Sequence, residues 1–89
     1  IINPCDFIQT KQATKAIANF SGPVYLRFGR PKVATFIPED MPFEIGKAIV
    51  LKEGTDVTII ATGHLVWEAL NAADMLEEKG INAEVVNIH

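Results

Sequence analysis

The stretch Gly54-Thr-Asp-Val-Thr-Ile-Ile-Ala-Thr-Gly-His-Leu-Val-Trp-Glu-Ala-Leu70 decides the fold of this chain. Within it, Val57–Ala61 is short, β-branched and continuously apolar, which is typical of a strand covered on both faces in a parallel sheet. Apolar residues then recur at helical spacing over 65–79, and Gly80 follows where a helix C-cap takes a positive φ. Strand character returns over Ile81–Ile88. The stretch therefore opens a strand–helix–strand unit, the crossover that two parallel strands require.

A second unit of the same kind is predicted in the first third of the chain. Ile1–Asn3 has the character of the end of a strand. Asp6 is a good helix N-cap, and Gln9 completes a capping-box pattern, so a helix is expected from about Phe7 to Asn19. Val24–Phe28 reads as the next strand. The apolar face of the helix would be formed by five residues: Ile8, Ala13, Ala16, Ile17 and Phe20.

The connection between the two units is predicted to be irregular. Residues 31–42 hold three prolines and two acidic residues, which favours an extended linker over a regular element. Ala48–Lys52 is a further candidate strand. The predicted fold class is α/β, with two β–α–β pieces whose parallel strands are covered by helices and joined by a proline-containing linker.

Composition narrows the class of protein. Eighty-nine residues fit one small domain or parts of two, and the net charge of −3 argues against a general nucleic-acid binder. Cys5 is the only cysteine, which excludes an intrachain disulfide and indicates a reducing, cytoplasmic setting. No apolar run approaches the roughly 20 residues that span a bilayer. The chain starts at Ile1 and ends at His89 directly after a strand, so a piece of a longer protein is expected.

Thr62-Gly63-His64 is the first candidate site. It follows a strand and precedes a helix, where amides at the helix N-terminus can bind an anion. The chain has no Gly-x-Gly-x-x-Gly or Walker pattern, and His64 has no ligating partner at metal-site spacing. A plain strand-to-helix turn is therefore favoured over an anion site here.

Arg27 and Arg30 form the second candidate site, at the end of the strand predicted over 24–28. A guanidinium beside a glycine- and proline-marked loop can bind a phosphate or carboxylate through two parallel hydrogen bonds. Physical reasoning alone favours surface pairing of these arginines with the acids Glu39, Asp40 or Glu44. Trp67 is interpreted as a packing residue of the core or of an interface.

Four stretches together resemble the thiamine-diphosphate-dependent transketolase family. They are Phe43-Glu-Ile-Gly-Lys-Ala48, Leu51-Lys-Glu-Gly-Thr-Asp-Val-Thr-Ile-Ile-Ala-Thr-Gly-His64, Glu68-Ala-Leu-Asn-Ala-Ala-Asp-Met-Leu76 and Gly80-Ile-Asn-Ala-Glu-Val-Val-Asn-Ile-His89. Asn3-Pro-Cys-Asp6 and Gly22-Pro-Val-Tyr-Leu-Arg-Phe-Gly-Arg-Pro31 fit the same family. The pattern is most similar to the separately encoded C-terminal section of split transketolases.

The resemblance implies a division of the chain and a role for one residue. Residues 1–33 would be the end of the pyrimidine-binding domain, 34–44 the interdomain linker, and 45–89 the start of the C-terminal domain. Arg30 matches the arginine that binds the phosphate of the sugar substrate in this family, which adds to the physical case for that residue. No such role carries over to Arg27.

The resemblance also implies partners that this chain lacks. The complete enzyme would use thiamine diphosphate and a divalent metal, Mg²⁺ or Ca²⁺, to transfer a two-carbon ketol unit between phosphorylated sugars. The metal- and diphosphate-binding signature, the catalytic glutamate and the sugar-contacting histidines belong to other parts of the protein. The chain alone is therefore expected to be inactive, and to need an N-terminal diphosphate-binding section within a homo- or hetero-oligomer.

Other readings remain open at this point. 1-Deoxyxylulose-5-phosphate synthase and the β subunit of 2-oxo-acid dehydrogenases share much of the pattern. A non-catalytic assembly module and a stand-alone Rossmann-like ligand binder are the alternatives outside this enzyme class.

Overall fold

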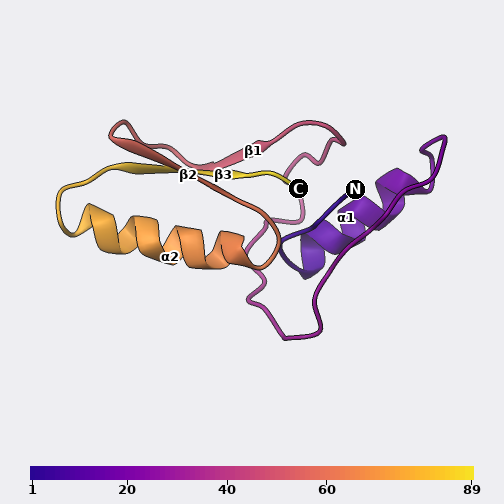
Figure 1. Ribbon diagram of the computed structural model, residues 1–89, viewed down its shortest axis with the longest axis horizontal. Helices are drawn as coiled ribbons and strands as arrows, with labels where there is room; N and C mark the ends of the chain where they lie inside the picture. Colours follow the sequence, from indigo (N-terminus) through magenta and orange to yellow (C-terminus); the bar gives the residue numbers. More distant parts are fainter.

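The computed structural model describes all 89 residues and contains two helices and one three-stranded sheet (Figure 1). The elements in chain order are α1 (Phe7–Ile17), β1 (Ile49–Lys52), β2 (Val57–Ala61), α2 (Leu65–Glu77) and β3 (Ala83–Asn87). α2 covers one face of the sheet, and α1 lies beyond the end of the sheet, which makes the molecule elongated at 45 × 25 × 22 Å. Neither helix is long and apolar enough to cross a membrane.

The predicted β2–α2–β3 unit is confirmed. β2 and β3 pair in parallel from Val57↔Ala83 to Ala61↔Asn87, and α2 is the crossover between them. α2 ends two residues earlier than expected, because the chain after Glu77 tightens into a turn that Gly80 completes with a φ of 81°. Beneath α2, four buried apolar residues form the core of this unit: Ala69, Ala73, Ala83 and Val85.

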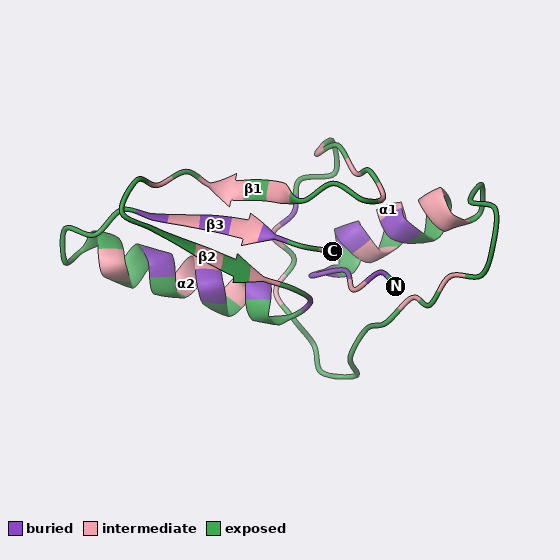
Figure 2. Ribbon diagram, turned by 45° about the horizontal axis from the view of Figure 1, so that its top comes forward, coloured by how far each residue is buried: buried purple, intermediate pink, exposed green.

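The sheet is mixed and is covered on one face only, which corrects two expectations. β1 pairs antiparallel with β3, and the strand order is β1-β3-β2. β2 therefore lies at an edge of the sheet and is not covered on both faces: Ile59 packs toward α2, whereas 64% of Ile60 is exposed on the opposite face. Val86 of β3 is the register partner of both Ile60 and Val50, and Val50 is also exposed. Figure 2 shows the exposed part of β2 in green.

In the predicted first unit the helix forms, but a single β-bridge stands in place of the two expected strands. Ile2 and Leu26 form a single parallel bridge, and the rest of 24–28 is not a strand. The two segments have no further strand beside them, and an isolated pair of strands is marginally stable. Tyr25 and Phe28 are 61% and 62% exposed for the same reason.

The predicted N-cap at Asp6 is confirmed, but Gln9 completes a variant of the capping box, because its side chain reaches the amide of the residue before the cap. The Asp6 side chain accepts a hydrogen bond from the Gln9 amide at 2.8 Å, and Gln9 Oε1 accepts one from the Cys5 amide at 2.8 Å. α1 ends at Ile17 instead of Asn19, and Phe20 is about half exposed, contrary to its predicted place on the apolar face. Gln12 of α1 donates to the Met41 carbonyl at 2.8 Å and so joins the helix to the connection.

The connection over residues 31–42 has no helix or strand, as predicted, but part of it packs against both units. Ile37 is 3% exposed and shares a small core with Cys5, Ile8 and Val66. The Phe36 and Trp67 rings are 5.3 Å apart, which confirms Trp67 as a packing residue. Phe36 and Ile37 of the connection therefore lie between α1 and α2 and belong to the folded core of the molecule.

Candidate functional site

A cleft of about 440 Å³ lies where α1, the loop after the Ile2–Leu26 bridge and the turn before α2 meet. Three segments line it. The N-terminal segment and α1 contribute Asn3, Pro4, Cys5, Asp6, Phe7 and Thr10; the loop contributes Phe28, Gly29, Pro31, Lys32 and Val33; the turn contributes His64.

The backbone around Ile2 holds the loop wall of the cleft in position. The Ile2 amide donates to the Tyr25 carbonyl at 2.9 Å, and the Arg27 amide donates to the Ile2 carbonyl at 2.8 Å. Arg27, the last residue held by these two hydrogen bonds, directly precedes Phe28, the first loop residue that lines the cleft. The residues after the bridge therefore leave the N-terminal segment at a defined point and form the opposite wall.

The two stretches that the sequence singled out lie side by side in this cleft. A Cβ atom added to Gly29 would lie 4.0 Å from Nδ1 of His64, so the imidazole is close to the loop backbone. Asn3 holds the turn from the other side: its Nδ2 donates to Thr62 Oγ1 at 3.3 Å, and its amide group leaves no room for a side chain at Gly63. Gly63 also has a φ of 60°, which favours glycine. Sequence reasoning did not identify Asn3, whose role depends on a contact with residues about 60 positions away.

Positive charge dominates the loop wall. Arg27, Arg30 and Lys32 lie within six residues, all are exposed, and no acidic side chain occurs between Arg27 and Pro38. The predicted pairing of the arginines with nearby acids is not found, since the ion pairs of the structure involve only Lys47 and Lys52. An anion at the cleft would thus meet loop cations that no salt bridge neutralises, while the Asp6 carboxylate in the opposite wall accepts hydrogen bonds from three backbone amides.

Arg30 itself lies between two residues of the cleft wall, Gly29 and Pro31, but its side chain does not line the cleft. Its role in binding a phosphate stays a prediction. The same holds for an anion at Thr62-Gly63-His64. His64 is the N-cap of α2, it is exposed, and its side chain makes no capping hydrogen bond.

Cys5 lines the cleft but is not a candidate nucleophile. Burial, together with the neighbouring Asp6 carboxylate, raises the pKa of its thiol to about 12. The residue is 1% exposed, and its sulfur accepts a hydrogen bond from Asn87 Nδ2 at 3.4 Å. Because the thiolate is the reactive form, Cys5 is chemically inert at neutral pH and belongs to the structure of the cleft floor.

Comparison with known proteins identifies the family. Residues 46–89 match the model of the transketolase C-terminal domain. Over 98% of its length the chain superposes with a TM-score of 0.93 and 47% sequence identity on a solved structure described as a split gene transketolase, inactive β4 tetramer. The chain belongs to the transketolase family.

Two relatives of the family match along nearly the whole chain. One of the two is a component of the apulose-4-phosphate transketolase of Phocaeicola vulgatus, and it is 44% identical over 99% of this chain. The other is SqwH, a component of the 6-deoxy-6-sulfo-D-fructose transketolase of a Clostridium species, and it is 45% identical over 100% of this chain. The chain spans 28% of the length of each relative and 29% of the solved structure.

These matches cover different parts of the cleft. The domain model covers β1, β2, α2 and β3 but only His64 among the cleft residues. The relatives and the solved structure extend the similarity over the N-terminal segment, α1 and the loop. The transketolase family therefore accounts for the complete cleft, and the resemblance found in the sequence is confirmed.

Proposed function

We propose that this chain is part of a thiamine-diphosphate-dependent transketolase that transfers a two-carbon ketol unit between sugars with a terminal anionic group. The observation that supports this most directly is the run of cations Arg27, Arg30 and Lys32 beside the cleft, none of which takes part in an ion pair of the structure. The two relatives are named for sugars that carry a phosphate and a sulfonate. Both groups are anions that a guanidinium can bind through two hydrogen bonds.

In this proposal Arg30 binds the anionic group, which is a phosphate in the substrates expected for this chain. Arg30 is preferred to Lys32 because a planar guanidinium matches the geometry of a phosphate better than an ammonium does. Gly29 before it and Pro31 after it line the cleft, so Arg30 lies next to the cleft wall, and its exposed side chain forms no ion pair.

The cofactor would bind outside this chain. Thiamine diphosphate supplies the carbanion chemistry of the reaction and requires a divalent metal. No group of three or more His, Cys, Asp or Glu side chains in the structure could hold such an ion. The residues present do not fit the cofactor's metal site, so we assign it to a separate diphosphate-binding section.

The proposal therefore includes an assembly with that section. Both relatives are named as single subunits of a transketolase, and the solved structure is a tetramer, which is consistent with such an assembly. We expect the complete enzyme to form only when this chain, as part of its longer section, meets the diphosphate-binding section, and we expect no turnover from this chain alone.

Replacement of Arg30 tests the substrate role. In the complete enzyme, Arg30→Ala should raise KM for a phosphorylated donor by about 10-fold to 100-fold, because a charge-assisted pair of hydrogen bonds is lost. KM for the unphosphorylated analogue should change less than about twofold by the same reasoning. Arg27→Ala is the matched control, because Arg27 is also exposed and its backbone hydrogen bond to Ile2 is kept. Equal effects of Arg30→Ala on both substrates would contradict the proposed role.

The choice of donor distinguishes the proposed reaction from its relatives. Turnover with xylulose 5-phosphate or another ketose phosphate supports transketolase. Turnover with pyruvate and glyceraldehyde 3-phosphate indicates the deoxyxylulose-phosphate synthase reaction, and acylation of a lipoyl domain indicates a 2-oxo-acid dehydrogenase. Lack of turnover with every donor, after reconstitution with the diphosphate-binding section, would favour a non-catalytic assembly module.

A further inference from the structure

We propose that Asp6 is a positioning residue, whose carboxylate holds the Arg30 loop at the distance from α1 that anion binding requires. This inference rests on the proposed function for the identity of the anion. The tether between Asp6 and residues 36 and 37 does not depend on the proposed function, because it follows from hydrogen bonds of the structure. Asp6 therefore has two separable tasks, one in capping α1 and one in fixing the loop.

The two oxygens of Asp6 perform these tasks separately. Oδ1 accepts a hydrogen bond from the Gln9 amide at 2.8 Å, which is the N-cap of α1. Oδ2 accepts from the amides of Phe36 and Ile37, each at 2.8 Å. Asp6 is 2% exposed, so these three bonds are protected from water. An N-cap needs only the first bond, and the other two need a separate explanation.

The loop between the bridge and Phe36 depends on its two ends. Phe28–Thr35 makes no hydrogen bond to the rest of the protein, and nearly all of its residues are exposed. Figure 2 shows it as the green segment that projects away from both helices. Its upstream end is fixed by the backbone pairing of Ile2 with Tyr25 and Arg27. Its downstream end is fixed by Asp6 Oδ2.

Both anchors of the loop come from the same five residues, 2–6, and residues 3–6 of this segment also form the opposite wall of the cleft. The N-terminal segment and the loop Phe28–Thr35 therefore enclose the cleft between them, and Arg30 lies near the middle of the exposed loop. Loss of the Oδ2 hydrogen bonds would leave the downstream end held only by the packing of Phe36 and Ile37, and the distance between the loop cations and α1 would become less strictly fixed. Binding would then require the loop to be ordered again, which weakens affinity.

The substitution Asp6→Asn is designed to keep the helix cap and to remove the hydrogen bonds to the loop. Asn is as good an N-cap as Asp, so Asp6→Asn should keep the hydrogen bond to Gln9. Its remaining polar atom is an NH₂ group, which can only donate and would face the donor amides of Phe36 and Ile37. Asp6→Ser is a second variant with the same logic, because Ser also caps helices and its shorter side chain cannot bond both segments.

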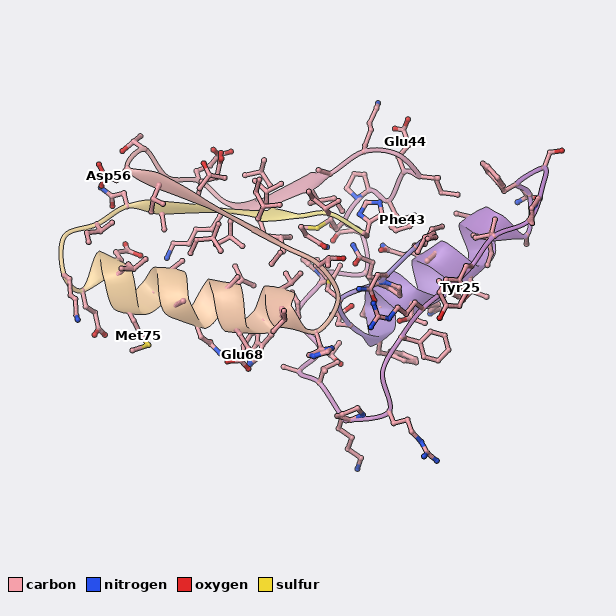
Figure 3. The ribbon with its side chains drawn as sticks, viewed as in Figure 1. Tyr25, Phe43, Glu44, Asp56, Glu68 and Met75 are labelled. Atoms are coloured by element: carbon pink, nitrogen blue, oxygen red, sulfur yellow. The ribbon has the colours of Figure 1, made fainter.

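The test measures steady-state kinetics and loop cleavage in the complete enzyme. Asp6→Asn should raise KM for the phosphorylated donor about 10-fold while kcat and the KM for the unphosphorylated analogue change less than about twofold, since only anion binding is affected. Trypsin should cut the Lys32–Val33 bond at least about fivefold faster, because an untethered loop is more accessible. Asp56→Asn is the matched control. Asp56 also accepts a backbone hydrogen bond, from Asn82 at 2.7 Å, but it lies at the far end of the sheet (Figure 3).

The outcomes separate this inference from the proposed function. If Asp6→Asn has the selective KM effect and adds nothing to Arg30→Ala in the double variant, Asp6 acts through Arg30. Two results for Asp6→Asn would overturn the inference. One is an equal change of KM for the phosphorylated and the unphosphorylated donor, and the other is unchanged kinetics together with unchanged trypsin cleavage. In both cases Arg30→Ala still tests the proposed function. If Arg30→Ala itself shows no selectivity, the proposed function fails, and the cleavage rate of Lys32–Val33 still decides for or against the tether. Asp6→Ser provides the same readouts if Asp6→Asn does not fold.

Discussion

Gly54 has less space around it than any other glycine of the chain. A Cβ atom at this position would lie 2.2 Å from the carbonyl carbon of Ala83 and 2.3 Å from the amide nitrogen of Glu84. Both atoms belong to the backbone at the start of β3, which cannot move without breaking its pairing with β2. Glycine is required here for close approach of two backbones.

Gly54→Ala is therefore expected to lower the free energy of unfolding by about 3 kcal/mol or more, at the upper end of overpacking effects. Gly80→Ala is the control, because Gly80 has a φ of 81° but no atom within 4 Å of an added Cβ. Its expected loss is about 1–2 kcal/mol from backbone strain alone. Urea denaturation of the two variants measures the difference, and a smaller loss for Gly54→Ala than for Gly80→Ala would contradict this account.

Cys5 makes stability depend on pH above the neutral range. In the unfolded chain the thiol ionises near its ordinary pKa of 9.0, whereas burial raises its pKa to about 12 in the folded protein. Between these values only the unfolded state releases the proton. The stabilising contribution of the protonated thiol is thus complete below pH 9 and is lost as the pH rises toward 12.

The free energy of unfolding should consequently fall by up to about 1.4 kcal/mol per pH unit from this group alone. Cys5→Ala removes the group but leaves every other titrating side chain, so the difference between the two proteins isolates its effect. Urea denaturation at about pH 8, pH 9.5 and pH 11 measures the slope. Parallel pH profiles of the two proteins would show that the thiol does not titrate as described.

At the scale of the elements, β2 has two unlike faces that its sequence does not distinguish. Ile59 and Ile60 are identical residues in the middle of one strand. Ile59 packs against the core beneath α2, whereas Ile60 lies on the open face and is 64% exposed. Figure 3 shows the same one-sided arrangement for α2, whose Glu68 and Met75 point away from the sheet.

Ile59→Ala should cost about 2–3 kcal/mol of unfolding free energy, because buried methylene contacts are lost. Ile60→Ala should cost less than about 1 kcal/mol, because most of the side chain is already in water. Thermal or urea denaturation of the two variants provides the comparison. Equal costs for the two substitutions would contradict the one-sided burial of β2.

At the scale of the whole molecule, a buried polar cluster joins the two α/β units. Asn87 at the end of β3 donates from Nδ2 to Gln9 Oε1 of α1 at 3.1 Å and to Cys5 Sγ at 3.4 Å. Gln9 and Asn87 are both fully buried. The chain ends meet beside them, where the Asn3 amide donates to the His89 carbonyl at 2.8 Å, and Figure 1 shows the N- and C-termini close together. The two units should therefore unfold as one.

A double-mutant cycle tests this coupling. Gln9→Ala and Asn87→Ala, made singly and together, should give an interaction energy of about 1–2 kcal/mol, as expected for a buried hydrogen bond between contacting residues. The control cycle uses Thr58 and Glu84, whose side chains form a 2.9 Å hydrogen bond on the exposed part of the sheet. That pair should couple by less than about 0.5 kcal/mol. Two separate unfolding transitions in the wild-type chain would contradict the cooperative picture.

The sequence by itself determined the local elements. Asp6 and Gln9 specify the start of α1, Gly80 specifies the end of α2, and the apolar periodicity specifies the β2–α2–β3 unit. These features were predictable because caps, periodicity and positive-φ glycines act over a few residues of chain. The transketolase resemblance was also visible, because it is carried by motifs in a fixed order.

Only the tertiary structure decided how those elements combine. It brought Gly29 beside His64, placed Asn3 against Gly63 and gave the second oxygen of Asp6 to amides about 30 residues away. It also set β1 antiparallel to β3 and left one face of β2 open. A linear pattern records which residues can form a helix or a strand, but not which distant backbone will meet them. These contacts depend on packing between segments separated by tens of residues, and that packing exists only after the chain has folded.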